Sequence, residues 1–454
     1  MKIIISGCGK VGHTLAKQLV KENHDIIIID NDPRIAEEVG NELDVFCVTG
    51  DAASHEVLTE AGVQDADLII SMTESDEKNL LICLIGKKLG VKHTIARVRN
   101  PVYAESVSLI KHDLGLSMFI NPELSAAREI SRILRCPAAT KIEPFAKGRV
   151  EMFSCTIKPD SVLDGIVLKD ISSAVKCRVF ICGVQRNNEV YIPDGMFELK
   201  AGDVISFIAS YKDSNIFFKR IGENTSKIKN VVIMGGGRLT YYLSRIILEA
   251  GGVNVKIIEV NKERCIELDE HFQKATIING DATDTTLFKE EDIENADAVV
   301  SLTGIDEQNV LISQYISEKH PDIKVITKIK HSDFENMFRH MKVGSLINPK
   351  NLTADNIIRY VRAMQNSSYS SDIVTLHHVI DGKAEALEFI VNGSHEFLGK
   401  PIETLKLRKD VLLASISRKG RVFTPSGKDT IEAGDTVIAV TMLTGISSIN
   451  DLFE

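Results

Sequence analysis

A long internal repeat constrains this sequence more than any other feature. The segment Ile3–Gly9 (IIISGCG) recurs as Val231–Gly237 (VVIMGGG), and further matches follow in the same order at offsets near 230 residues. The other matched pairs are Thr49–Ala52 with Asn279–Ala282, Asp65–Thr73 with Asn295–Thr303, Asp76–Asn79 with Asp306–Asn309, Ile120–Pro122 with Ile347–Pro349, and the turns Pro193–Gly195 and Lys200–Asp203 with Pro425–Gly427 and Glu432–Asp435. Matched segments in one order indicate a tandem duplication, so the 454 residues form two copies of about 227.

The first part of each copy has the pattern of an α/β domain. An apolar run at 2–6 is followed by Val11, Leu15 and Leu19 at helical spacing. Further short apolar runs lie at 26–30, 44–48, 67–71, 93–98 and 117–120, with helix-length stretches between them. This alternation predicts a Rossmann-like, doubly wound parallel sheet covered on both faces. Asn121-Pro122 and Asn348-Pro349 then predict helix starts, for helices at 122–135 and 349–363 that leave the sheet.

The last 80 or so residues of each copy have a different character. Short β-rich runs such as Met152–Ile157, Val179–Val184 and Val204–Ala209 are separated by turns that contain Gly and Asp. We therefore expect four domains in the order A-B-A-B. Their boundaries are 1–135 and 229–363 for the sheet domains, and 142–222 and 370–454 for the small α+β domains.

Composition excludes several classes of protein. The net charge of −9 and the lack of a basic stretch argue against nucleic-acid binding, although an acidic protein could dock on a basic protein partner. No apolar run is long enough to span a bilayer, and Met1 leads directly into a strand-like run rather than a signal peptide. The eight cysteines contain no Cys-x-x-Cys pair, which favours reduced, buried thiols over a metal site. We therefore expect a cytosolic protein.

The segment Gly7–Gly12 (GCGKVG) fits the dinucleotide-binding pattern G-x-G-x-x-G. It lies between a strand and an amphipathic helix, which is the context that this pattern requires. Gly7 allows the tight turn, Gly9 leaves room for a pyrophosphate, and Gly12 lets the helix pack close to the strand. The free amides at the helix N-terminus would face the phosphate charge.

An acidic residue follows at the expected distance. Asp30 ends the second strand, 23 residues after Gly7, where its carboxylate would accept hydrogen bonds from the ribose hydroxyls of adenosine. The same charge would repel a 2′-phosphate, so NAD is favoured over NADP. The alternative is that these glycines only form a tight turn in an empty domain, but an Asp at the end of an aliphatic strand is costly without a partner.

Three other positions point to the same edge of the sheet. Thr73 and Glu74 follow the fourth strand, and open α/β sheets bind ligands at the carboxyl ends of their strands. Arg97 ends the fifth strand and could contact a phosphate or carboxylate, or form a simple salt bridge. Asp51 follows the third strand and could reach the adenine or ribose, or cap the next short helix.

The second copy departs from this fingerprint. Gly235, Gly236 and Gly237 are followed by Arg238 and Leu239, but Thr240 replaces the third glycine of the pattern. The acidic position is Glu259, 24 residues after Gly235, Asp281 corresponds to Asp51, and Lys328 stands where the first copy has Arg97. We expect some loss of close helix packing. Either a weaker or different nucleotide site, or a domain kept only as scaffold, is consistent with this pattern.

No catalytic constellation accompanies the nucleotide motifs. A Walker A sequence is absent, and the histidines are scattered without metal-ligand spacing. Hydride transfer would need a substrate pocket beside the nicotinamide, and the small β-rich domains provide no such set of residues. Two nucleotide domains without a substrate domain favour a sensor over an enzyme.

The domain order and motifs resemble the tandem regulator-of-potassium-conductance (RCK) family, in which TrkA-N and TrkA-C domains alternate. The resemblance covers essentially the whole chain, and its most specific segments are Ile3–Gly12, Val48–Asp51, Asp67–Thr73, the Ile-Asn-Pro helix starts and the Gly-Asp turns. It implies a regulatory subunit without catalysis, which binds NAD(H), ATP or ADP. It also implies a homo-oligomeric ring on the cytoplasmic face of the membrane that gates a potassium transporter subunit of the TrkH-like type.

The resemblance also implies two sets of binding residues. The first site would comprise Gly7, Cys8, Gly9, Lys10, Val11, Asp30, Thr73, Glu74 and Arg97. The second would comprise Gly235, Gly236, Gly237, Arg238, Leu239, Glu259, Thr303, Gly304 and Lys328. Thr240 puts the ligand of the second site in doubt. A soluble NAD-dependent oxidoreductase and a structural ring with a permanent nucleotide are the competing hypotheses.

Overall fold

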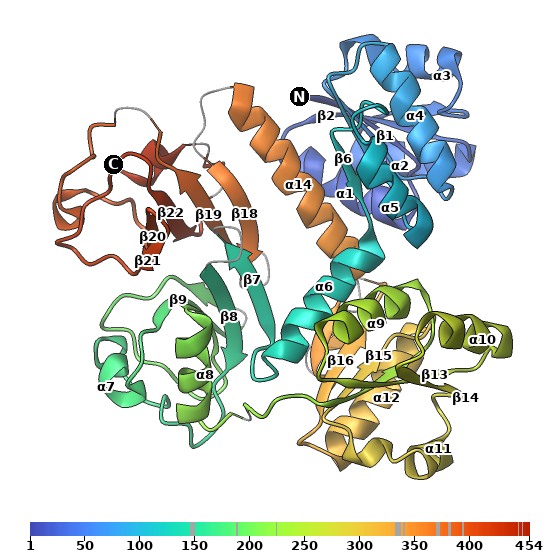
Figure 1. Ribbon diagram of the computed structural model, residues 1–454. Helices are drawn as coiled ribbons and strands as arrows, with labels where there is room; N and C mark the ends of the chain where they lie inside the picture. Colours follow the sequence, from blue (N-terminus) through green and yellow to red (C-terminus); the bar gives the residue numbers. More distant parts are fainter. Residues whose placement is uncertain are drawn as a thin grey trace. The chain divides into compact units, whose positions relative to one another are not determined.

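The computed structural model describes the whole chain except residues 146–149, 188, 224, 332–336, 339–340, 369–372, 380–382, 393–394, 444 and 447. The chain forms two compact units, and each unit takes one segment from each copy. The first consists of Met1–Ser131 and Lys229–Ile358, and the second of Arg132–Ile228 and Arg359–Glu454. Like domains are therefore grouped together, because the sheet domains share one unit and the small domains share the other (Figure 1).

The first copy of the sheet domain is a six-stranded parallel sheet in the order β3-β2-β1-β4-β5-β6. Its strands are β1 (Lys2–Ser6), β2 (Asp25–Asp30), β3 (Phe46–Thr49), β4 (Leu68–Ser71), β5 (His93–Arg97) and β6 (Met118–Ile120). Its helices are α1 (Lys10–Lys21), α2 (Pro33–Leu43), α3 (His55–Glu60), α4 (Asp76–Lys88), α5 (Pro101–Ile110) and α6 (Pro122–Arg135). The strand order reverses between β1 and β4, and such a switch point is where open α/β sheets bind ligands.

The second copy repeats this topology strand for strand, in the order β14-β13-β12-β15-β16-β17. Its strands are β12 (Asn230–Met234), β13 (Asn254–Glu259), β14 (Ala275–Asn279), β15 (Ala298–Ser301), β16 (Lys324–Lys328) and β17 (Ser345–Ile347). Its helices include α9 (Arg238–Ala250), α10 (Lys262–His271), α11 (Thr285–Glu290), α12 (Asp306–Lys319) and α14 (Pro349–Ser368). The predicted duplication and the Rossmann-like fold class are confirmed.

Burial on both faces explains the uninterrupted apolar strands. Ile3, Ile4 and Ile5 alternate between the two faces of the first sheet, and all three are completely buried. Helices cover both faces, so a polar side chain inside a strand needs a hydrogen-bond partner, as Thr94 of β5 has in the Gly115 carbonyl. Polar and charged residues therefore gather at the carboxyl ends of the strands.

The second unit holds two antiparallel five-stranded sheets of identical topology, β7-β8-β11-β9-β10 and β18-β19-β22-β20-β21. The first sheet consists of β7 (Lys141–Phe145), β8 (Val150–Thr156), β9 (Phe180–Arg186), β10 (Glu189–Tyr191) and β11 (Val204–Ala209), with helices α7 (Ile171–Val175) and α8 (Tyr211–Arg220). The second consists of β18 (Ile373–Val379), β19 (Ala384–Ile390), β20 (Val411–Arg418), β21 (Arg421–Phe423) and β22 (Thr436–Thr441). An antiparallel sheet domain thus follows each parallel sheet domain. The expected α+β composition holds for the first copy, whereas the described residues of the second small domain form only the short 3-10 helices Ile402–Thr404 and Ile449–Leu452.

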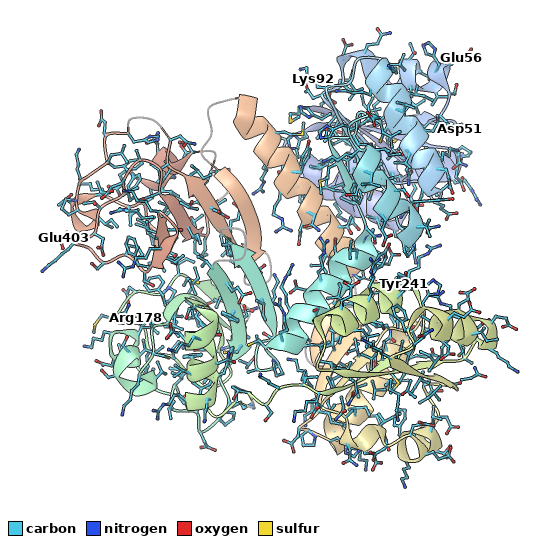
Figure 2. The ribbon with its side chains drawn as sticks, viewed as in Figure 1. Asp51, Glu56, Lys92, Arg178, Tyr241 and Glu403 are labelled. Carbon is cyan, nitrogen blue, oxygen red and sulfur yellow. The ribbon has the colours of Figure 1, made fainter. Side chains whose placement is uncertain are left out.

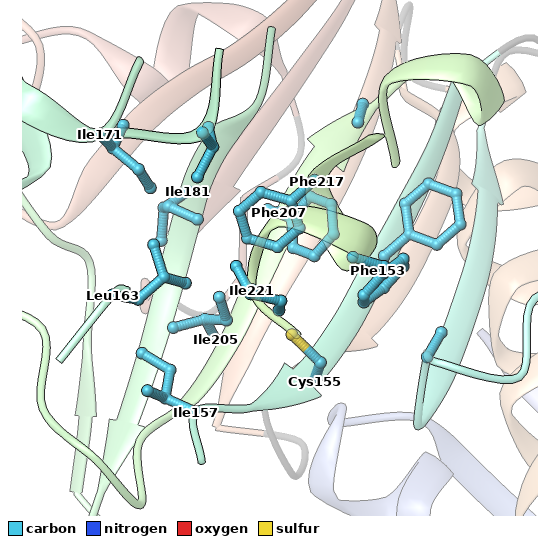
Figure 3. Close-up of a cluster of buried hydrophobic side chains, with 14 of the residues drawn as sticks. Phe153, Cys155, Ile157, Leu163, Ile171, Ile181, Ile205, Phe207, Phe217 and Ile221 are labelled. Carbon is cyan, nitrogen blue, oxygen red and sulfur yellow. The ribbon is translucent and has the colours of Figure 1, made fainter. Parts of the chain in front are cut away.

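Two kinds of apolar core hold this unit together. In the first small domain Phe207 packs against Phe217 and Phe153, with ring centroids 4.5 and 5.5 Å apart (Figure 3). A second cluster contains residues of both sheets, among them Met152 from the first and Ala386 from the second. Each small domain thus has a core of its own, and the two also share buried apolar surface.

The Asn-Pro pairs start helices as predicted. The Asn121 side chain accepts a hydrogen bond from the Leu124 amide at 2.9 Å, and Asn348 accepts one from the Lys350 amide at 3.1 Å. The division between the two units falls inside α6 and inside α14, so each helix continues from a sheet domain into the second unit.

The eight cysteines all lie in the described part of the chain, and each is a free thiol. In the same part, no group of three or more His, Cys, Asp or Glu side chains is arranged to hold a metal ion. No described helix combines the length and the apolar composition that crossing a membrane requires.

The glycine loop leads to a first prediction on stability. A Cβ added at Gly12 would lie 2.1 Å from the carbonyl oxygen of Gly7, whereas a Cβ at Gly9 would meet nothing within 4 Å. We expect Gly12→Ala to lower the free energy of unfolding by about 1–3 kcal/mol, as overpacking does. Gly9→Ala should change it by less than about 1 kcal/mol. Urea denaturation of both variants measures the difference, and equal losses would contradict the assigned loop geometry.

Candidate functional site

The first glycine loop leaves the start of α1 open. Gly7 has φ +87° and donates its amide to the carbonyl of Ile29 at 2.8 Å, which turns the chain sharply after β1. Gly9 precedes the helix and offers no side-chain cap, and both Gly9 and Lys10 are exposed. The amides of the first turn are therefore available to an anion, with the positive end of the helix dipole behind them.

Asp30 lies beside this loop, at the end of β2 where it was predicted. Its carboxylate is 93% buried and accepts hydrogen bonds from the amides of Cys8 at 2.6 Å and Asp32 at 3.0 Å. These amides already pair with the charge, so the carboxylate does not need a ligand for its stability, contrary to the argument made from sequence. Each oxygen accepts one of these bonds and keeps a lone pair that a ribose hydroxyl could use.

Arg97 is a buried cation without an anionic partner. Its Nη2 donates to the carbonyl of Thr73, but its Nε is buried and has no hydrogen-bond partner in the described structure. Burial and the nearby Arg99 lower the pKa of this guanidinium, and carboxylates in the surroundings oppose this shift without forming a described ion pair with it. The simple salt bridge considered from sequence is not formed. An unpaired buried charge calls for a partner of opposite sign.

Two residues that the sequence analysis did not select hold this edge of the sheet together. Asn79 accepts bonds from the Thr73 amide at 2.8 Å and hydroxyl at 2.7 Å, and its Nδ2 donates to the Arg97 carbonyl at 2.9 Å. Asp76 accepts the amides of Arg99 at 2.8 Å and Asn100 at 2.7 Å. Both belong to the Asp76–Asn79 repeat segment, and that recurrence was the signal that could have identified them.

The other predicted residues of the first site have more peripheral positions. Asp51 forms a local turn with the Ala53 amide at 2.9 Å and an ion pair with Lys78 at 2.9 Å, and these contacts lower its pKa (Figure 2). Ser54, not Asp51, precedes α3. Glu74 is exposed and Val11 half-buried at the rim. Cys8 is buried, and burial raises its thiol pKa to about 12, so it contributes its backbone rather than a reactive sulfur.

The second glycine loop has the same hydrogen-bond plan with a longer acid. The Gly236 amide donates to Glu259 Oε2 at 2.6 Å, and the Asn261 amide donates to Oε1 at 2.8 Å. A Cβ at Gly236 would lie 3.0 Å from the Glu259 side chain and 2.7 Å from Leu268. Glycine therefore takes the place of Cys8 because Leu268 and the longer Glu259 side chain fill that space.

Thr240 changes how α9 meets its loop. The residue is completely buried, and its hydroxyl donates to the Gly235 carbonyl. In the first copy this space holds no side chain, since a Cβ at Gly12 would clash with Gly7. The second copy thus replaces close backbone packing with a side-chain hydrogen bond. Gly237 precedes α9 without a side-chain cap, Arg238 is exposed and Leu239 is buried.

Lys328 repeats the buried cation of the first copy. Its Nζ donates to the Leu302 carbonyl at 2.8 Å, and burial together with nearby Lys330 lowers its pKa to about 8. Asn309 accepts the Thr303 amide at 2.8 Å and donates to the Lys328 carbonyl at 3.0 Å, as Asn79 does in the first copy. Gly304 is exposed at the same edge. Asp281 accepts the Thr283 amide at 2.8 Å in an exposed turn, like Asp51.

Both sheet edges therefore combine three elements of a dinucleotide cradle. Each has an uncapped helix N-terminus, a carboxylate held by the loop amides and a buried cation at the end of the neighbouring strands. This donor and acceptor set fits the pyrophosphate and the adenosine ribose of NAD or an adenine nucleotide.

The buried Lys328 predicts a pH dependence of stability. Its pKa of about 8 lies below the ordinary 10.5, so between these values the unfolded chain holds a proton that the folded chain has released. The shift corresponds to about 3 kcal/mol. Lys328→Met should raise the free energy of unfolding by up to that amount at pH 7, and the gain should shrink as pH rises from 8 to 10. Urea denaturation across this range, with the exposed Lys319→Met as control, measures it; parallel pH profiles for both variants would contradict the prediction.

Comparison with known proteins identifies the family of the chain. The TrkA-N domain model matches residues 3–122 and 231–349, and the TrkA-C domain model matches 152–222 and 386–454. A Trk system potassium uptake protein TrkA homolog of Archaeoglobus fulgidus is 34% identical over 455 residues, covering 100% of both chains. The Trk system potassium uptake protein TrkA of Haemophilus influenzae is 29% identical and covers 100% of this chain and 99% of its own.

Solved structures share the fold at lower identity. The structure titled "Crystal Structure of the GsuK RCK domain" has a TM-score of 0.62 and 17% identity, covering 97% of this chain and 92% of its own. The "GsuK channel bound to NAD" has a TM-score of 0.63 and 17% identity, covering 97% and 76%. Family models on both copies and full-length relatives lead to one conclusion: the chain belongs to the TrkA family of Trk system potassium uptake proteins.

Proposed function

We propose that the chain is a regulatory subunit that binds NAD(H) or an adenine nucleotide at its sheet edges and thereby gates a membrane potassium transporter. Its family consists of regulatory RCK proteins rather than enzymes, which favours this function over an NAD-dependent oxidoreductase. We keep the domain boundaries 1–135, 142–222, 229–363 and 370–454 as part of this proposal.

The buried guanidinium of Arg97 carries the nucleotide assignment. Arg97 ends β5, and its Nη2 donates to the Thr73 carbonyl that follows β4, the strand beside the switch point. The strands that lead to the open N-terminus of α1 and to Asp30 lie on the other side of β4. A pyrophosphate would pair directly with this guanidinium, which no described carboxylate does, while Asp30 would bind the ribose hydroxyls. The solved structures titled "GsuK channel bound to NAD" and "Crystal structure of the GsuK bound to ADP" are consistent with ligands of this class.

The second edge supports a ligand that differs from the first. Glu259 reaches one methylene further into the loop than Asp30, and Thr240 fixes the loop by its hydroxyl. Lys328 offers a point charge instead of the planar fork of Arg97, which suits a single phosphate oxygen better than bidentate recognition. We therefore propose weaker or different adenine-nucleotide binding at this edge.

Gating requires that the ligand prefer one arrangement of the protein over another. We propose that several copies form a ring, docked peripherally on the cytoplasmic face of a TrkH-like transporter, and that nucleotide changes the shape of this ring. Leu81 on α4 and Leu311 on α12 occupy matching positions in the two copies and are 48% and 66% exposed. Apolar side chains repeated in this way on two exposed helices fit a surface between subunits.

A thermal-shift panel of NAD, NADH, ATP and ADP tests nucleotide binding. A ligand at 100 times its dissociation constant stabilises the folded state by about 2.7 kcal/mol. NADH should raise the melting temperature of the unmodified protein, and Asp30→Ala and Gly9→Ala should reduce that shift. Glu259→Ala should reduce a separate contribution from the second edge.

The matched control is Asp25→Ala, because Asp25 is exposed at the opposite end of the same strand as Asp30. It should leave every shift unchanged. If none of the four nucleotides stabilises the unmodified protein, the proposed function is wrong.

Leu81→Glu and Leu311→Glu test the ring. A buried carboxylate in an apolar subunit interface is costly, so we expect the oligomer to dissociate at least partly at micromolar concentration. Light scattering coupled to gel filtration measures the mass. Lys88→Glu, at an exposed position on the same helix as Leu81, should leave the mass unchanged. A monomeric unmodified protein would overturn the ring.

A further inference from the structure

Within the first unit, helix α9 of the second copy contacts the first copy through the buried Tyr242 and through an exposed ion pair between Arg245 and Glu105. Tyr242 is the fifth residue of α9, five positions after the last glycine of the loop that precedes this helix. Its side chain is 95% buried. Its neighbour Tyr241, labelled on α9 in Figure 2, is more exposed and packs against Phe272 of its own copy.

The hydroxyl of Tyr242 makes two hydrogen bonds, both with the first copy. It donates to the carbonyl of Arg99 at 2.9 Å and accepts a bond from Nδ2 of Asn121 at 2.8 Å. Burial raises the pKa of Tyr242 to about 12, so the hydroxyl keeps its proton at ordinary pH. Both the donor and the acceptor capacity of the group are thus used across the two copies.

Each end of this contact lies next to one of the two sheet edges. Arg99 follows the buried cation Arg97 by two residues, and Asp76 holds its amide at 2.8 Å. At the other end, α9 starts directly after Gly237, so its position depends on the loop that would receive the second nucleotide. A shift of α9 that follows ligand binding at Gly235–Gly237 would therefore act on the strand end that carries Arg97.

In the described structure, helix α1 of the first copy makes no equivalent contact with the second copy. Thr14 occupies the position of Tyr242 in α1, and its hydroxyl donates to Lys10 of its own helix at 2.9 Å. The carbonyl of Lys330, which corresponds to that of Arg99, accepts a bond from Lys350 within its own copy. Asn348 corresponds to Asn121, and its Nδ2 is buried with no hydrogen-bond partner in the described part of the chain.

Among the described residues, the start of α1 makes one polar contact with the second copy. The Nζ of Lys10 lies 3.3 Å from Nε2 of His331, but both side chains reach solvent, where such contacts contribute little. The duplicated fold therefore places one buried polar connection, not two, between the copies at these positions.

We propose that Tyr242 couples the two nucleotide edges, so that occupancy of the second changes the affinity of the first through Arg99 and Asn121. This inference rests on the proposed function, which assigns a nucleotide to both edges. Tyr242 is a positioning residue, since it touches neither cradle and acts only on the strand end behind Arg97. Because coupling between binding sites is reciprocal, the first ligand must change the affinity of the second by the same factor.

Isothermal titration of the full chain with NADH measures this factor. Lys328→Met leaves only the first site and Arg97→Met leaves only the second, so these variants give the two separate association constants. The overall constant of the unmodified protein, divided by their product, gives the coupling factor. We expect it to differ from one by about five-fold or more, the usual lower range for coupled sites.

Tyr242→Phe is introduced into the unmodified protein and into the Lys328→Met and Arg97→Met variants. It should bring the coupling factor close to one and leave each separate association constant within about two-fold of its value without this substitution. A change confined to the factor distinguishes coupling from a general loss of structure. Asn121→Ser removes the Nδ2 donor but keeps a side chain that caps α6, and it should reduce the factor as well. Tyr241→Phe and Thr14→Ala are the matched controls and should leave the factor unchanged.

The outcomes separate this inference from the proposed function. Two NADH sites with a coupling factor of one, or an unchanged factor in Tyr242→Phe and Asn121→Ser, overturn the coupling role of Tyr242 and leave nucleotide binding intact. If the unmodified protein binds NADH at only one site, the coupling of two sites is wrong but nucleotide binding is not. Absence of any binding overturns the proposed function together with the inference.

Discussion

Both sheet edges depend on one hydrogen bond, between an amide of the glycine loop and the carboxylate that ends the neighbouring strand. Cys8 donates to Asp30 and Gly236 donates to Glu259, each at 2.6 Å. A charged hydrogen bond of this kind fixes the loop against the sheet. Because this bond fixes the position of the loop, it also sets where the uncapped helix starts and how much space remains for a ligand. The edge is thus organised before any nucleotide is bound.

The sequence predicted the topology well because duplication and burial leave periodic signals. The apolar runs 2–6, 26–30 and 67–71 coincide closely with β1, β2 and β4, since strands buried on both faces must be continuously apolar. The acids at Asp30 and Glu259 were also found, because their distance from the glycines is set by one β-α-β unit. Spacing could not show that the loop amides, rather than a ligand, pair with these acids.

Other residues were missed for a different physical reason. Asn79 and Asp76 read as an ordinary helix start, and only their bonds to the ends of β4 and β5 reveal that they brace the site. Tyr242 reads as a core residue of an amphipathic helix, because contacts between copies leave no periodic trace in either copy. The sequence also could not predict that like domains share one compact unit. The two kinds of domain alternate along the chain, and contacts between copies leave no periodic pattern.

Duplication gave the chain two equal frameworks, and side-chain differences have made their edges unequal. Thr240 replaces Gly12, Glu259 replaces Asp30, and Lys328 replaces Arg97, so the backbone plan is kept while the charge geometry changes. Two different edges in one chain can respond to two ligands, whereas two identical edges would respond only to the concentration of one. A sensor of the ratio between nucleotides needs such a difference, and it also needs a connection that lets each edge report on the other. In the proposed coupling, the buried hydroxyl of Tyr242 provides this connection, and Thr14 at the matching position of the first copy makes no such contact.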